Sequence, residues 1–156
     1  MNTTSKPKIF ISFSTKNIDL CKSIVSKLDS EHYEFWYQDK IDIGQDYRPI
    51  IKENIDSSVA TLILLSDSFL NSKFIQEEEV PWIINKDDLS LIYEIIPLQI
   101  EECEWESLDF LKEKQIYPSR TKALDLDNSV QIENIRKHIF NYLDNAGYIE
   151  KKGWFR

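Results

Sequence analysis

A carboxylate and an aromatic ring stand four residues apart in the segment Ser72-Lys73-Phe74-Ile75-Gln76-Glu77-Glu78. We expect a helix to begin near Ser72, and residues four apart in a helix lie one turn apart on the same face. Phe74 and Glu78 would therefore point into one cleft. This pairing suits a substrate in which a heterocycle is joined to a ribose, because a fixed carboxylate stabilises or traps the positive charge that develops on the sugar when that bond breaks.

Three consecutive glutamates, Glu77, Glu78 and Glu79, occupy this part of the expected helix. Successive residues diverge by about 100° around a helix, so we expect only one of the three carboxylates to face the centre of a cleft. For Glu77 and Glu79 the sequence favours a solvated helix face. The selection of Glu78 depends on the family pattern described below.

Segments typical of strands alternate along the chain with segments typical of helices. Residues 59–65 are almost continuously apolar, as in a parallel strand that is buried on both faces. The sequence predicts strands at residues 8–13, 33–37, 59–65, 91–98 and, as a weaker edge strand, 122–126, with helices near residues 20–28, 47–55, 72–86 and 128–143.

This alternation predicts an α/β fold of the flavodoxin-like type. We expect a three-layer sandwich, with a five-stranded parallel sheet of order 2-1-3-4-5 and helices on both faces. Ligands of such sheets bind beyond the carboxyl ends of the first and third strands, where the winding reverses. The loop 13–17 should therefore lie beside the loop 66–72, with the loop after Tyr37 close to both.

Length and charge limit the classes of function. The 156 residues, 42% of them hydrophobic, suit one domain, which we place at residues 1–147, with a tail or a linker to another module at residues 148–156. The net charge is -8 and no dense cluster of Lys and Arg occurs, which argues against direct binding of nucleic acid. Three glycines, Gly44, Gly147 and Gly153, are too dispersed to form a glycine-rich phosphate loop.

Metal sites and membrane segments are not indicated either. The cysteines Cys21 and Cys103 and the histidines His32 and His138 are not grouped at ligand spacing, so we expect no metal and no cofactor. Residues 1–8 lack an apolar stretch, and no run approaches the ~18 apolar residues of a membrane span. The sequence therefore favours a cytoplasmic protein without membrane contact.

Four segments, in this order and at these intervals, resemble the Toll/interleukin receptor (TIR) family, in particular its bacterial members. The resemblance covers residues 8 to about 146. Its last segment is similar to the family pattern S-x-W-C-x-x-E, with phenylalanine at the usual tryptophan position and isoleucine at the frequent cysteine. The segments are Phe10-Ile11-Ser12-Phe13-Ser14, the loop residue Gly44, Leu65-Ser66-Asp67-Ser68-Phe69 and residues 72–78.

The resemblance implies roles for individual residues. The last glutamate of the pattern, Glu78, is catalytic in members that consume NAD⁺. Phe74 would take the place of the stacking tryptophan, and the hydroxyls of Ser12 and Ser14 could bind phosphate or ribose, or merely cap the following turn. The residues expected around the substrate are Phe74, Ser12, Phe13, Ser14, Asp39 and Gly44, the last two in a loop that in the family also mediates contacts between protomers.

The function that the resemblance implies is that of an NAD⁺ nucleosidase. Such an enzyme releases nicotinamide from its substrate NAD⁺ and leaves linear or cyclic ADP-ribose. Self-association into a homo-oligomer through TIR–TIR contacts would activate it, with a sensor domain or partner chain as a further partner, in microbial immune defence or cell-death signalling. Two alternatives stay open: a non-catalytic TIR adaptor module, and a nucleoside deoxyribosyltransferase-like enzyme, which shares the winding. The retained Glu78 favours the nucleosidase, because adaptors often lack this glutamate.

Overall fold

A parallel sheet of four strands forms the centre of the fold. The computed structural model describes residues 6–39, 46–90 and 92–149. The strands follow the order β2-β1-β3-β4, and every neighbouring pair is parallel. They are β1 (Lys8–Ser12), β2 (Glu34–Trp36), β3 (Ala60–Leu65) and β4 (Glu94–Gln99).

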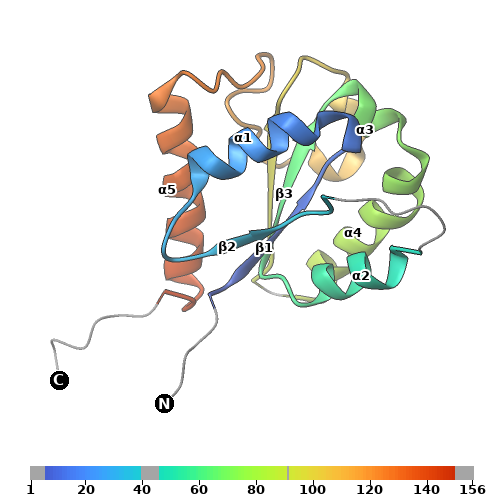
Figure 1. The fold of residues 1–156 in the computed structure, drawn as a ribbon, viewed down its shortest axis with the longest axis horizontal. Coiled ribbons are helices and arrows are strands. Elements are labelled where there is room, and N and C mark those ends of the chain that lie inside the picture. Colours follow the sequence, from blue (N-terminus) through green and yellow to red (C-terminus); the bar gives the residue numbers. More distant parts are fainter. Residues whose placement is uncertain (1–5, 40–45, 91, 150–156) are drawn as a thin grey trace, which may run out of the picture.

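Helices cover both faces of this sheet, so the predicted three-layer α/β sandwich is confirmed (Figure 1). Two of them, α1 and α5, lie on one face, and α2 and α4 lie on the other. Within the part of the chain that the structure describes, no helix is long and apolar enough to cross a membrane. The helices are α1 (Ile18–Leu28), α2 (Arg48–Asp56), α3 (Asp67–Asn71), α4 (Val80–Leu89) and α5 (Ser129–Asn145).

Successive side chains of β3 point to opposite faces of the sheet and contribute to two separate hydrophobic cores. Leu62 and Leu64 belong to the core under α1 and α5, whereas Ile63 and Leu65 belong to the core under α2 and α4. Each of these four side chains is completely buried. The continuous apolar run of the sequence therefore predicted the strand that is buried on both faces.

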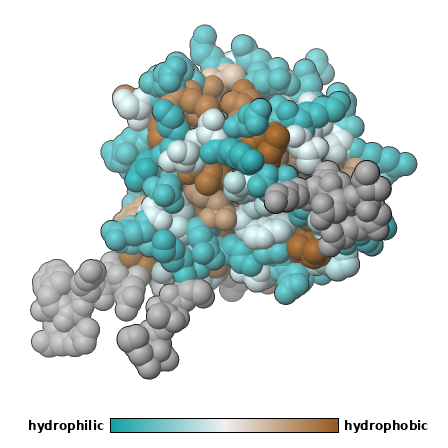
Figure 2. Space-filling model, in the orientation of Figure 1, coloured by the Kyte–Doolittle hydropathy of each residue, from teal (hydrophilic) through white to brown (hydrophobic). Residues whose placement is uncertain are grey.

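Figure 2 shows that side chains of hydrophilic residues dominate the outer surface, with the largest hydrophobic area in the upper half of the face in view.

The prediction of a fifth strand at residues 122–126 is wrong. Beyond β4, residues 100–149 make a single isolated parallel bridge to the sheet, between Leu98 and Tyr117. The backbone N–H of Leu124 then donates a hydrogen bond of 2.7 Å to the carbonyl oxygen of Gln99. The chain thus touches the edge of β4 at two points without running beside it as a strand.

The buried amide of Gln99 explains why the chain turns here. Its Nε2 donates to the carbonyl oxygens of Ser119 at 3.2 Å and Lys122 at 3.1 Å, and its Oε1 accepts from the backbone N–H of Cys103 at 3.3 Å. These carbonyls bind a side chain and are therefore not available to a strand ladder. The loop 100–128 also contains two short 3-10 turns, η3 (Trp105–Ser107) and η4 (Asp109–Leu111).

Both ends of α5 carry residues that favour helix termini. Asn128 caps the helix, because its Oδ1 accepts from the backbone N–H groups of Val130 and Gln131, both at 3.1 Å. Gly147 follows the helix with a φ of 85°, a conformation that favours glycine. Ile149 packs partly against the core, and residues 150–156 lie outside the described part of the chain. The domain boundary at residue 147 stays a prediction.

Candidate active site

A cavity of about 380 Å³ opens beyond the carboxyl end of β1. Side chains from three segments line it, residues 10–15, 46–51 and 72–79, together with Gln38. These segments are the end of β1, the start of α2 and the approach to α4. This volume lies in the range of about 300 to 1,000 Å³ that is typical of small-molecule sites. The switch point of the sheet thus carries a cavity where the sequence predicted one.

The two loops at the switch point are joined by a hydrogen bond. The hydroxyl of Ser66, directly after β3, donates to Oδ1 of Asn17 at 2.8 Å. The same hydroxyl accepts from the backbone N–H of Phe69 at 3.0 Å and so caps α3. The prediction that the loop 13–17 lies beside the loop 66–72 is therefore confirmed.

A wide helical turn precedes α4. Residues Ile75–Glu79 form a π-helical turn (η2), and the backbone N–H of Val80 bonds to the carbonyl oxygen of Ile75, five residues earlier. Pro81 is the physical reason, because proline has no N–H to donate and its ring clashes with the carbonyl four residues before it in a regular helix. A turn closed over five residues holds more side chains than a regular turn. Its successive side chains therefore diverge by smaller angles.

This turn brings two carboxylates to the cavity instead of one. Both Glu78 and Glu79 line it. The expectation of a solvated face is wrong for Glu79, which is only 6% exposed, and holds for Glu77, which is exposed. The π-helical turn shifts the phase that a regular helix would give these residues, and the sequence-based assignment assumed a regular helix.

Glu79 is a buried acid with a hydroxyl as its hydrogen-bond partner. Ser12 Oγ donates to Glu79 Oε1 at 2.7 Å. Burial raises the pKa of Glu79 from the ordinary 4.5 to about 7, although the bond from Ser12 acts in the opposite direction. Ser12 is fully buried and does not line the cavity. Its hydroxyl is therefore engaged with Glu79 and not placed for the expected contact with substrate.

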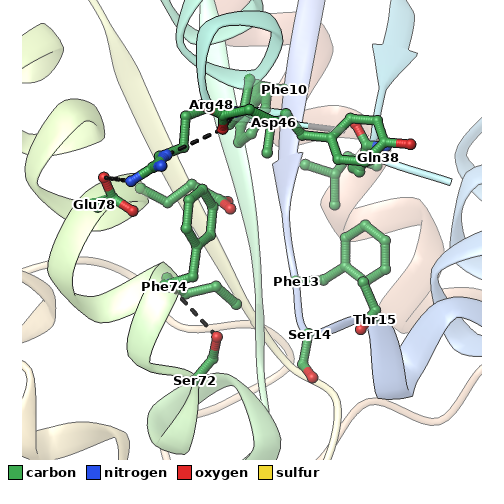
Figure 3. A pocket seen from close by; sticks show the side chains of 15 residues that line it. Phe10, Phe13, Ser14, Thr15, Gln38, Asp46, Arg48, Ser72, Phe74 and Glu78 are labelled. Carbon is green, nitrogen blue, oxygen red and sulfur yellow. Dashed lines mark hydrogen bonds and ion pairs between the residues drawn. The ribbon is translucent and has the colours of Figure 1, made fainter. Parts of the chain in front are cut away.

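Glu78 lies beside an arginine that also lines the cavity (Figure 3). Glu78 Oε1 lies 3.6 Å from Nη1 of Arg48, the first residue of α2. Nε of Arg48 in turn donates to Asp46 Oδ1 at 3.1 Å, and the backbone N–H of Arg48 donates to the same oxygen at 3.1 Å. The hydrogen bond from the backbone of Arg48, followed by the one from its side chain, holds the pKa of Asp46 below its ordinary 3.8.

Phe74 belongs both to the cavity wall and to the core. Its half-buried ring lines the cavity and meets Trp82 edge-on, with the ring centroids 6.3 Å apart. Trp36 stacks on Phe10 at 5.6 Å, and Trp105 is buried. Trp36, Trp82 and Trp105 therefore serve packing, and none of them lines the cavity. The stacking role of Phe74 stays a prediction.

The remaining predicted site residues have different surroundings. Phe13 and Ser14 line the cavity opposite Phe74 and Glu78 (Figure 3). The Ser14 hydroxyl also accepts a 3.3 Å hydrogen bond from the backbone N–H of Lys16 and so caps the 3-10 turn η1 (Thr15–Asn17).

The described cavity lacks one residue that was expected from the loop after Tyr37. Asp39 does not line it, and its carboxylate lies 3.3 Å from Nζ of Lys22 on α1. The structure therefore does not place Asp39 beside the expected substrate. Gly44 lies outside the described residues.

Sequence reasoning missed Arg48, a cation that lines the cavity. Its signal was its position, directly before Pro49 at the start of the expected second helix and beside the loop after Tyr37. Among the described residues, no group of three or more His, Cys, Asp or Glu is placed to hold a metal ion. The site thus presents three carboxylates, one guanidinium and aromatic walls to an organic ligand.

Comparison with known proteins identifies relatives of the domain. A family model described as the TIR domain matches residues 9–139. The TIR domain of the Toll-related receptor TRR-2 from Hydra magnipapillata superposes with a TM-score of 0.56 at 18% identity, over 86% of this chain and 96% of that one. The RPS4 and RRS1 TIR domain heterodimer gives a TM-score of 0.60 at 11% identity, over 88% and 98%. No match is found among curated proteins.

Proposed function

The chain belongs to the TIR domain family, and from this membership together with its cavity we propose that it is an NAD⁺ nucleosidase with Glu78 as the catalytic carboxylate. The observation that carries the proposal is the placement of Phe74 and Glu78 on one wall of the 380 Å³ cavity at the switch point of the sheet. Phe13 and Ser14 form the facing wall. A nicotinamide riboside unit would lie between the two walls.

The proposed reaction breaks the bond between C1′ of the ribose and the nitrogen of nicotinamide. The bonding electron pair leaves with nicotinamide, which departs as a neutral molecule, so that no strong general acid is needed. The carboxylate of Glu78 stabilises the oxocarbenium charge that forms at C1′, or traps it as an ester. Water then adds to C1′ and loses a proton, which gives ADP-ribose. A ring nitrogen of the adenine, taking the place of water, gives a cyclic product.

Association with a second TIR domain is part of this proposal. The structural relatives RPS4 and RRS1 are described as a TIR domain heterodimer. This supports a contact of the same kind for the present chain, whether between identical copies or with a partner. We propose that the enzyme acts in microbial immune defence or cell-death signalling and that it is active only when assembled. A dilute sample would therefore show almost no activity.

The test is release of nicotinamide from NAD⁺ by purified protein at high concentration or on a crowding surface. We expect wild type to release nicotinamide. In Glu78→Gln the rate of release should be at least about a hundredfold lower, because the carboxylate charge is removed at nearly constant shape. Glu77→Gln is the matched control, since Glu77 is exposed and does not line the cavity. Product analysis would also separate linear from cyclic ADP-ribose.

An adaptor module without chemistry is the second candidate, and the heterodimer among the structural relatives favours it equally. It would be supported if wild type and Glu78→Gln both left NAD⁺ intact under conditions in which the protein assembles. Equal, substantial rates for the two proteins would instead show that NAD⁺ is cleaved without Glu78.

A further inference from the structure

Arg48 is the single cation that lines the cavity among the described residues. Three carboxylates line the same cavity, those of Asp46, Glu78 and Glu79. The whole chain has a net charge of -8. A dinucleotide carries a doubly charged pyrophosphate, which needs a local positive charge on such an acidic protein. Within the described lining, the guanidinium of Arg48 is the group that can supply it.

Arg48 holds its two carboxylate partners unequally. Its Nε is bonded to Asp46 at 3.1 Å, whereas its Nη1 lies 3.6 Å from Glu78, beyond hydrogen-bonding distance. The side chains of Arg48 and Glu78 are 56% and 34% exposed. An ion pair of this kind favours the paired state by at most about fivefold. The outer end of the guanidinium can therefore change its partner while Nε remains bonded to Asp46.

We propose that Arg48 exchanges Glu78 for the pyrophosphate of the dinucleotide, so that the binding of substrate releases the catalytic carboxylate. This inference rests on the proposed nucleosidase function and specifies the substrate class as one with a pyrophosphate. Guanidinium groups bind phosphate oxygens in pairs, which Arg48 can do with the Nη end that now faces Glu78. In NAD⁺ that pyrophosphate is joined through a single CH₂–O link to the ribose on which Glu78 would act.

The exchange has a consequence for the chemistry. While Arg48 lies beside Glu78, its positive charge offsets the negative charge that must stabilise the sugar cation. Once Arg48 has moved to the pyrophosphate, the carboxylate meets the sugar without this compensation. Binding of the anion and release of Glu78 are then coupled, and the coupling must be equal in both directions.

The coupling can be measured without any turnover, with ADP-ribose as the probe and isothermal titration calorimetry as the assay. We expect Arg48→Gln to weaken the binding of ADP-ribose by about tenfold to a hundredfold. Glu78→Gln should strengthen it by up to about fivefold, because Arg48 then has no ion pair to break. Lys52→Gln is the control, since this cation of α2 pairs with Asp56 at 3.1 Å and does not line the cavity.

The double variant Arg48→Gln/Glu78→Gln distinguishes exchange from simple repulsion between Glu78 and phosphate. If Arg48 mediates the effect, the gain from Glu78→Gln disappears when Arg48 is absent. A gain that persists in the double variant overturns the inference. So does an Arg48→Gln protein that is folded by circular dichroism and binds ADP-ribose as tightly as wild type.

Kinetics with two substrates give an independent readout. For NAD⁺, Arg48→Gln should raise KM by about tenfold or more. Nicotinamide riboside has no phosphate, so its turnover should rise by up to about fivefold in the same variant, because Glu78 is no longer paired. An equal loss with both substrates would overturn the exchange.

The two proposals can fail separately. If ADP-ribose binding follows the pattern above but wild type releases no nicotinamide, the anion-binding role of Arg48 stands and the nucleosidase proposal fails. If wild type cleaves NAD⁺ and Arg48→Gln does so with an unchanged KM, the nucleosidase stands and the exchange fails.

Discussion

Replacing the buried Glu79 by glutamine should change the dependence of stability on pH. In the folded protein the pKa of Glu79 is raised from 4.5 to about 7 by burial, so the folded state holds a proton that the unfolded chain has lost over that interval. The stability associated with protonated Glu79 is fully present below pH 4.5 and is lost as the pH rises through 7. Glutamine keeps an oxygen that can accept the bond from Ser12 and cannot ionise.

The size of the effect follows from the difference between the pKa of Glu79 in the folded protein and in the unfolded chain. A tenfold change in the acid constant corresponds to about 1.4 kcal/mol, so ionised Glu79 costs wild type about 3 kcal/mol at a pH well above 7. Part of that cost is already present at pH 5.5. Between pH 5.5 and pH 8, the stability of Glu79→Gln relative to wild type should therefore increase by about 2 kcal/mol.

Urea unfolding, followed by circular dichroism at several pH values, measures this difference directly. A lower limit of pH 5.5 avoids the sequence pI of about 4.8, at which the protein would tend to associate. Glu77→Gln is the control, because the side chain of Glu77 is exposed, and this variant should follow wild type at every pH. If wild type and Glu79→Gln change in parallel between pH 5.5 and pH 8, Glu79 is not a buried acid with a raised pKa.

Two further substitutions test other contacts described above. Ser12→Ala removes the hydroxyl that is bonded to Glu79 at 2.7 Å. Because this bond stabilises the ionised carboxylate, we expect the variant to lower the free energy of unfolding by about 1–3 kcal/mol at pH 8 and by less at pH 5.5. Urea unfolding at both pH values measures the loss, and a loss that is equal at the two values would show that this reason is wrong. Asn128→Ala removes the cap of α5 and should lower the free energy of unfolding by about 1 kcal/mol, as measured by thermal or urea unfolding. An unchanged free energy of unfolding would mean that water replaces the two capping bonds.

The layered fold could be predicted because its signal is local and repeated. An apolar run at residues 59–65 indicated a strand buried on both faces, and β3 has this environment. The expected edge strand at residues 122–126 had only a short pattern of this kind. What decides its conformation is the amide of Gln99, which binds the carbonyls of Ser119 and Lys122, 20 and 23 residues away in sequence. No periodicity in the sequence records such a contact.

The candidate site was predictable to the level of its loops and less so at the level of individual side chains. Phe74 and Glu78 share the cavity as predicted, although the turn that carries Glu78 is π-helical and not the regular helix assumed. The burial of Glu79 was missed because Pro81 produces a wide turn, which changes the direction of each side chain in it. Arg48 was missed because its partner Glu78 is distant in sequence, and the pairing depends on how α2 packs beside the approach to α4.

The irregular chain beside β4 determines how this sheet can meet another protein. Strands at the margin of a sheet normally offer unpaired backbone groups on which a foreign strand can assemble. Here the backbone of Gln99 is already bonded to Tyr117 and Leu124, and at the opposite margin β2 is only three residues long. Within residues 6–39, 46–90 and 92–149, neither margin offers a long template for strand addition. If copies of this domain associate as proposed, side chains on helices and loops would form the contact, which could be dissolved without separating a shared sheet.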